Sequence, residues 1–293
     1  MQSVDPTREL EALIRLIDEP DEEVFRKIRE KILGYSSSAI PLLQKIWDNN
    51  FNPQIQSRIE SLMAQLRRES LYQELSNWYT LGGMNLLLGY ILVSRSEHPN
   101  LDEEKIRNFI DKIKQDIWLE LNNNLTALEK VRIINKIIYD IYRFDGNRTH
   151  FHSPSNFLVD QLIETRKGSP ISLSILYIVL AQSLGMPVYG VNLPEHFVLA
   201  WVDEQADGEF SNEDDEGVMF YINAFSKGAV FSKREVDQFL IQVKIAPQKA
   251  FYQPCSNIDI IVRLLRNLIF SYKKMGENEK AAELEKLQSI FIV

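Results

Sequence analysis

The apolar positions of this chain follow a helical repeat over most of its length. The first helix shows the i, i+3, i+4, i+7 spacing of one buried face, carried by Leu10, Leu13, Ile14 and Ile17. The same period predicts helices throughout residues 7–67 and 70–142. It returns after residue 257 in two helices that are split at Gly276. The chain is therefore expected to be mostly helical.

The period of the pattern changes from about 3.6 to 2 in only one region of the chain. Alternation there predicts four strands, at residues 188–192, 197–202, 218–223 and 228–231. An apolar helix at 170–184 precedes them, with Ser169 as its N-cap and Pro170 in its first turn. We therefore expect an α+β fold in which a small antiparallel sheet packs on a central buried helix.

Three regions follow from these patterns: residues 1–68, 69–252 and 253–293. The first contains LIRLIDEPDEEVFRKIREKIL and SSSAIPLLQKIW, which resemble a HEAT repeat. The last resembles one tetratricopeptide repeat, through Asn267, Leu268, Tyr272, Gly276 and Ala281. Several such repeats are normally needed to form a binding groove, so a single hairpin is expected to be structural.

Composition excludes several classes of function. The 293 residues carry a formal net charge of −8 and no basic stripe, which disfavours binding to nucleic acid or to an anionic membrane. With Cys255 as the single cysteine, no intrachain disulfide can form, which suits a reducing compartment. The chain shows no apolar run of membrane-spanning length and no segment typical of a signal peptide. These features predict a cytoplasmic protein.

The helix at 170–184 and the strands after it hold the best candidates for chemistry. A thiol at a helix N-terminus has a lowered pKa, a histidine on a neighbouring strand accepts its proton, and an Asp or Asn orients the imidazole. The chain offers His196 just before one strand and Asn223 at the end of the next. The helix, however, opens with Pro170, which has no nucleophile.

Several segments together are similar to a known family: LLLGYILVSR (86–95), FDGNRTHFHSPSNFL (144–158), RKGSPISLSILYIVLAQSLGMPVYGVNLPEHFVLAW (166–201) and RLLRNLIFSYKKMGENEKA (263–281). They resemble the SirB-type transglutaminase-like family of bacteria, which implies a core of the transglutaminase and papain type. Matched residue by residue, His196 takes the position of the family's histidine and Asn223 that of its Asp. Pro170 stands where true transglutaminases have cysteine.

The resemblance therefore favours a catalytically degenerate protein that binds a protein or peptide through residues near the former site: Glu195, His196, Asn223, Ser172 and Asn156. A first alternative is a peptidase- or amidase-like hydrolase that uses His196 with Ser172 or another nucleophile. Ser172 lies about 200° around the helix from Pro170, so both cannot face His196 equally. A second alternative is a helical scaffold.

No cofactor or metal is expected. The pair His150 and His152 lacks further ligands, since the chain has only four histidines. The acidic stretch 203–217 lacks the ordered spacing of a calcium loop and is expected to be a solvated loop. No phosphate-binding or dinucleotide motif is present. Cys255 is expected to fill a small buried site.

Overall fold

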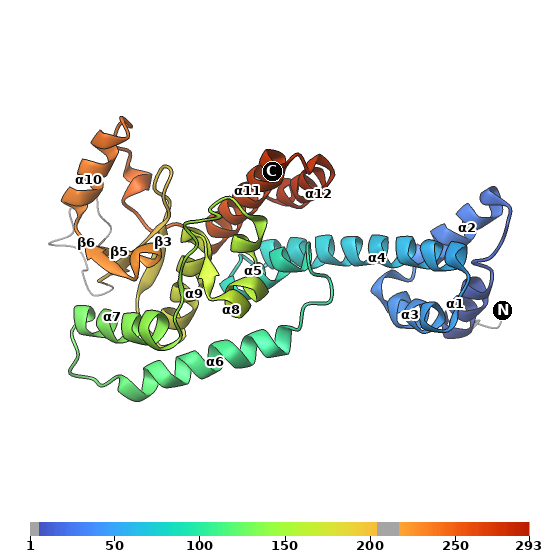
Figure 1. Cartoon of the computed structure of the whole chain (residues 1–293), viewed down its shortest axis with the longest axis horizontal. Coiled ribbons are helices and arrows are strands. Elements are labelled where there is room, and N and C mark those ends of the chain that lie inside the picture. Colours follow the sequence, from blue (N-terminus) through green and yellow to red (C-terminus); the bar gives the residue numbers. More distant parts are fainter. Residues whose placement is uncertain (1–5, 204–216, 293) are drawn as a thin grey trace. The chain divides into compact units, whose positions relative to one another are not determined.

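A computed structural model describes residues 6–203 and 217–292 of the chain (Figure 1). The chain forms two compact units, Met1–Ser76 and Asn77–Val293. Residues 204–216, which make up nearly all of the acidic stretch, lie outside the described residues. No helix of the described part combines the length and the apolar character that crossing a bilayer requires.

The first unit consists of short helices packed on one apolar core. Its elements are α1 (Pro6–Arg15), α2 (Glu22–Leu33), the 3₁₀ turn η1 (Ser36–Ala39), α3 (Ile40–Asn49) and most of α4 (Pro53–Thr80). The apolar face predicted for the first helix is confirmed, because Leu10, Leu13, Ile14 and Ile17 are all buried in this core. Asp21 caps α2 by accepting hydrogen bonds from the N–H groups of Glu23 and Val24.

Helix α4 is longer than the pattern predicted. Residues 67–70, which separate two predicted helical stretches, continue the helix without a break. Arg and Glu are strong helix formers, and neither Gly nor Pro interrupts this stretch. A gap in the apolar repeat therefore changes which face is buried without ending the helix.

The second unit contains the predicted antiparallel sheet. Its strands are β3 (Val188–Val191), β4 (Val198–Val202), β5 (Val218–Asn223) and β6 (Ala229–Phe231), in that order. Leu199 pairs with Ile222, and Ala200 pairs with Tyr221. A second, parallel ladder joins β1 (Asp145–Gly146) to β2 (Lys167–Gly168). This ladder was not predicted, because strands of two residues give no alternation to read.

Helix α9 (Pro170–Gln182) is the centre of this unit (Figure 1). It contacts β3 and β4 on one side and α5 (Leu86–Arg95) and α11 (Asn257–Met275) on others. Val198 and Ala200 of β4 pack instead with Val236 and Leu240 of α10 (Lys233–Gln242). Since successive strand residues point to opposite faces, the sheet lies between α9 and α10. Burial on both faces explains why β4 is apolar throughout.

The remaining elements surround this centre. They are α6 (Glu103–Glu120), α7 (Ala127–Asn135), the π-helical segment η2 (Lys136–Ile141), η3 (Pro154–Phe157), α8 (Val159–Thr165), η4 (Ala224–Ser226), η5 (Lys249–Phe251), α12 (Asn278–Gln288) and η6 (Ser289–Phe291). A capping box of Thr126 with Glu129 begins α7. The predicted break at Gly276, whose φ is +80°, ends α11.

Asn135 joins three elements of the second unit. Its Nδ2 donates to the carbonyl oxygen of Gly228 at 2.9 Å, and its Oδ1 accepts from the hydroxyl of Tyr177 at 3.1 Å. Gly228 has φ of +70°, and a Cβ at this position would overlap the side chain of Asn135. The turn between β5 and β6 therefore requires glycine for two reasons, its backbone conformation and the space that Asn135 occupies.

We predict that Gly228→Ala destabilises the protein by about 2–4 kcal/mol, from the left-handed backbone and the displaced Asn135 together. Gly185→Ala is the matched control, because Gly185 also has φ of +70° and a Cβ there would meet nothing within 4 Å. Its expected cost is about 1 kcal/mol. Urea unfolding of both variants measures the difference, and equal costs would show that the contact with Asn135 contributes nothing.

Candidate functional site

A small cavity lies where α9 begins. Its volume is about 180 Å³, and its walls come from the loop before η3, the start of α9, the β3–β4 connection and α11. Five of the residues named from the sequence line it: Ser169, Pro170, Glu195, His152 and Asn267. The structure therefore places a pocket at the end of the helix where the sequence suggested a site.

Pro170 is the first residue of α9 and contributes neither an N–H group nor a nucleophile to the cavity. Ser169, the predicted N-cap, is confirmed in that role: its Oγ accepts from the N–H of Ser172 at 3.2 Å. Ser172 reciprocates, since its Oγ accepts from the N–H of Ser169 at 2.8 Å. Ser172 is fully buried and does not line the cavity, so its hydroxyl serves the start of the helix.

The imidazole of His196 packs against Phe239 of α10, with ring centroids 5.3 Å apart. The cavity is lined by its neighbours Glu195 and Phe197 and not by His196 itself. Burial is the main cause that lowers the pKa of His196 below 6.5; the positive charge of Arg263 adds to this, and Glu195 opposes it. The imidazole is therefore neutral at pH 7.

Asn223 ends β5 and caps the next turn. Its Oδ1 accepts from the N–H of Ser226 at 3.1 Å, and its carbonyl accepts from the N–H of Gly228 at 2.9 Å. By the register of the sheet, Asn223 lies across from Val198, two residues beyond His196. Within the described residues no hydrogen bond joins the amide of Asn223 to the imidazole, so Asn223 at the end of β5 and His196 in the β3–β4 connection do not form a pair.

Asn156 is buried and orders the loop beside the cavity. Its Oδ1 accepts from Nδ2 of Asn147 at 2.9 Å, and its Nδ2 donates to the carbonyl of His150 at 2.6 Å. Its own carbonyl accepts from the N–H of Ser169 at 3.1 Å. Asn156 therefore ties the loop to the first turn of α9, and its amide is occupied by the protein itself.

One face of α11 supplies a polar wall that the sequence analysis did not single out. Arg263, Asn267 and Ser271 are spaced four residues apart and all line the cavity. The guanidinium of Arg263 also holds the β3–β4 connection, because it donates to the carbonyl oxygens of Leu193 at 3.0 Å and His196 at 3.3 Å. Three polar residues on one line of an otherwise apolar helix face are the sequence signal that could have identified this wall.

Cys255 lies outside the cavity. Its backbone N–H donates to the carbonyl of Gly190, and burial, with the nearby charge of Asp259, raises the pKa of its thiol to about 12. The thiol is therefore protonated at neutral pH, which makes it a poor nucleophile. Cys255 is only partly buried, so its role as a small buried residue stays a prediction.

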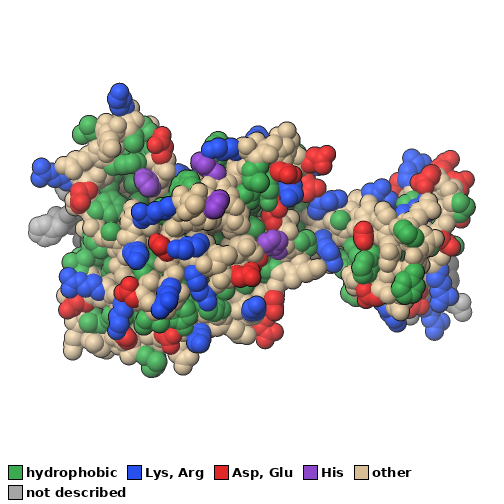
Figure 2. All heavy atoms as spheres, viewed as in Figure 1, with side chains coloured by type: hydrophobic (Ala, Val, Ile, Leu, Met, Phe, Trp, Pro, Cys, Tyr) green, Lys and Arg blue, Asp and Glu red, His purple; other side chains and the backbone are tan. Residues whose placement is uncertain are grey.

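The surface around the cavity is polar and carries cations. Figure 2 shows exposed histidines on the same face of the second unit as a group of Lys and Arg side chains. Arg148 lies over the ring of Phe225 at 5.6 Å, and that ring contacts Phe151 of the cavity wall. Across residues 6–203 and 217–292, no group of three or more His, Cys, Asp or Glu side chains is arranged to hold a metal ion.

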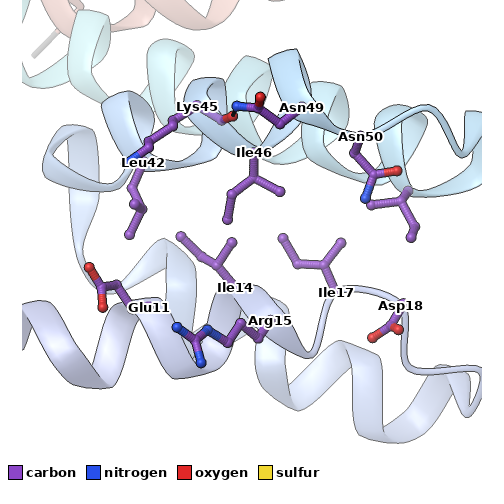
Figure 3. Close-up of a pocket in the computed structure, with 11 residues that line it drawn as sticks. Glu11, Ile14, Arg15, Ile17, Asp18, Leu42, Lys45, Ile46, Asn49 and Asn50 are labelled. Carbon is purple, nitrogen blue, oxygen red and sulfur yellow. Dashed lines mark hydrogen bonds between the residues drawn. The ribbon is translucent and has the colours of Figure 1, made fainter.

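A larger hollow of about 480 Å³ lies in the first unit (Figure 3). Ile14 of α1 and Ile17, just after it, point toward Ile46 and Leu42 of α3, and charged side chains such as Glu11 and Arg15 lie along the edge of the hollow. Its floor is aliphatic, so the hollow is described as a packing feature of the helix pair.

Comparison with known proteins gives one family and several relatives. A family model described as the transglutaminase-like superfamily matches residues 104–266. F-box only protein 21 of Mus musculus is 34% identical over 143 residues, which are 49% of this chain and 22% of that protein. A UPF0162 protein of Xylella fastidiosa is 26% identical over 202 residues, which are 66% of this chain and 66% of that protein. A UPF0162 protein of Vibrio cholerae is 24% identical over 189 residues, which are 62% of this chain and 64% of that protein. The chain thus spans about a fifth of the F-box relative and about two thirds of the bacterial ones. No solved structure matches.

We predict that the imidazole of His196 titrates below pH 6.5, because burial disfavours its charged form. The unfolded chain then binds this proton more tightly than the folded protein does. Stability is therefore unaffected by His196 above about pH 6.5 and decreases as the pH is lowered through that value. Histidine NMR signals followed against pH, with His196→Gln to assign the signal, measure the midpoint. A midpoint above 6.5 would contradict the buried environment.

Proposed function

The chain belongs to the transglutaminase-like superfamily, and we propose that it is a catalytically degenerate, SirB-type member that binds a protein or peptide. One observation carries the proposal: Pro170 opens α9 at the cavity, in the position where a nucleophilic thiol would stand. The first turn of α9 has a complete capping box, but its first residue is a proline and carries no nucleophilic sulfur or oxygen atom.

The other nucleophiles of this region support the same proposal. The hydroxyl of Ser172 is buried and bonded to Ser169, so it lacks both a base and access to a substrate. The thiol of Cys255 is held protonated by its raised pKa. A hydrolase that used Ser172 with His196 would need the capping box to open, which favours binding over hydrolysis.

The cavity itself favours binding over a purely structural role. Phe157 and Phe197 are buried in its walls, while Phe151 and Phe270 are exposed beside them. Aromatic walls with a few converging polar groups are typical of ligand sites. In this proposal the HEAT-like region 1–68 precedes the domain 69–252 in the sequence, and the tetratricopeptide-like hairpin 253–293 supplies one wall of its cavity. A helical scaffold alone would not require the hollow.

We predict that the protein forms no covalent adduct with a glutamine-mimicking electrophile or with a fluorophosphonate, reagents that capture active thiols and hydroxyls. Intact-mass spectrometry of the full chain after incubation at pH 7 measures the adduct. Cys255→Ala is the control for slow labelling of the buried thiol. An adduct that forms on wild type and disappears in His196→Gln would overturn the proposal and revive the hydrolase.

We predict that Pro170→Cys creates a reactive thiol in the Cys255→Ala background. The N-terminal end of α9 stabilises the thiolate, so alkylation by iodoacetamide at pH 7 is expected to be about tenfold faster than for an ordinary exposed thiol. His152→Cys in the same background is the matched control, because it lines the same cavity from a loop. Equal rates at the two positions would show that the helix start no longer activates a nucleophile.

A further inference from the structure

We propose that the cavity at the start of α9 binds a carboxylate that is attached to an apolar or aromatic group, with Arg263, Asn267 and Ser271 as its polar contacts. The inference rests on the proposed function, since the ligand is held and not converted. The ligand chemistry follows from the charge, the unused hydrogen-bonding groups and the aromatic walls of the cavity, taken in turn.

Arg263 supplies the positive charge. It is half-buried, and all three of its hydrogen-bond acceptors are neutral: Oδ1 of Asn192 and the carbonyl oxygens of Leu193 and His196. No carboxylate of the described residues forms an ion pair with it. A cation withdrawn from water without an anionic partner is costly, and an anion bound in the cavity would relieve that cost. Guanidinium groups bind carboxylates with matching geometry.

Ser271 and Asn267 supply hydrogen-bonding groups without a present partner. Ser271 is 1% exposed, and its Oγ has no hydrogen-bond partner among residues 6–203 and 217–292. Leaving a buried hydroxyl unpaired destabilises a protein, so such a group in a cavity wall indicates a partner that arrives from outside. Asn267 lies one turn earlier and also lines the cavity, and its side-chain amide makes no hydrogen bond within that part of the chain. Both side chains can donate to a carboxylate oxygen.

The first turn of α9 adds a further donor. The first four N–H groups of a helix have no partner within it. In α9, Pro170 has no N–H, and the N–H groups of Ser172 and Leu173 donate to Oγ and the carbonyl oxygen of Ser169. The N–H of Ile171 remains unused by the helix, and Ile171 lines the cavity. The positive end of the helix dipole also favours a negative charge here.

The aromatic side chains define the rest of the ligand. Phe151 contacts His152 edge to face at 5.3 Å, and His152 contacts Phe270 at 5.9 Å, so the rings form a row beside the cavity. The buried rings of Phe157 and Phe197 complete its apolar wall. At about 180 Å³ the cavity is smaller than the roughly 300–1,000 Å³ of sites for larger organic ligands. It therefore suits a single side chain or a small acid.

Glu195 is the one carboxylate among the described residues that line the cavity. It is exposed, so water screens its repulsion of a bound anion. Removing its charge should therefore leave carboxylate affinity unchanged or increase it slightly. This expectation separates a carboxylate site from a site for cations, in which Glu195 would be the main contact.

The test uses two matched ligand pairs with the full chain in isothermal titration calorimetry. One pair is 3-phenylpropionate and its primary amide; the other is the peptide Ala-Ala-Ala-Phe with a free or an amidated C-terminus. We expect each acid to bind at least tenfold more tightly than its amide. A peptide acid that binds much more tightly than phenylpropionate identifies a chain terminus as the source of the carboxylate, and equal affinities identify a small acid.

Variants then assign the contacts. Arg263→Gln and Asn267→Leu are each expected to weaken binding of the tighter acid by about tenfold, and Ser271→Ala by several-fold. Arg266→Gln, an exposed arginine on the same helix that does not line the cavity, is the matched control and should leave affinity unchanged. Ser271→Ala should also leave the melting temperature unchanged or raise it, because the hydroxyl it removes has no partner.

Equal affinity for acid and amide, or no binding of either acid, would overturn the carboxylate site while leaving the absence of catalysis intact. Weaker binding in Glu195→Gln would also overturn it. A lowered melting temperature in Ser271→Ala would show that the hydroxyl has a structural role. Conversely, a covalent adduct or consumption of the ligand, detected by mass spectrometry of the same samples, would overturn the proposed function and not the site.

Discussion

The complete burial of α9 is the constraint on which the second unit depends. Its residues are apolar around the whole helix, and nearly all of them are buried. Such a helix is stable in water only if protein covers every side, so the sheet, α5 and α11 must all pack on it. Its N-terminus borders the cavity of about 180 Å³, and the polar features of the region converge there.

The first turn of α9 is stabilised without any reactive group. Ser169 and Ser172 satisfy each other's backbone, and Pro170 has a fixed φ that suits the first helical position. Both features stabilise the helix start, and neither needs a reactive group. A thiol at the same position would contribute little to helix stability, whereas proline is favoured at the first helical position.

Much of the fold could be predicted from the sequence, because helix and strand periods, N-caps and the break at Gly276 are local signals. Features that depend on distant residues could not. The ring of His196 packs on Phe239, forty-three positions away, and no spacing near His196 indicates that direction. The π-helical segment Lys136–Ile141 keeps the apolar character of a helix while changing its pitch, so the period there looks unbroken. The polar wall of α11 was missed because its sequence does not say which element it faces.

The match to the superfamily ends at residue 266, partway along α11, so Arg263 lies inside the shared region while Asn267 and Ser271 lie beyond it. The three polar residues that line the cavity from α11 therefore fall on both sides of the point where the match ends, although a single continuous helix carries them.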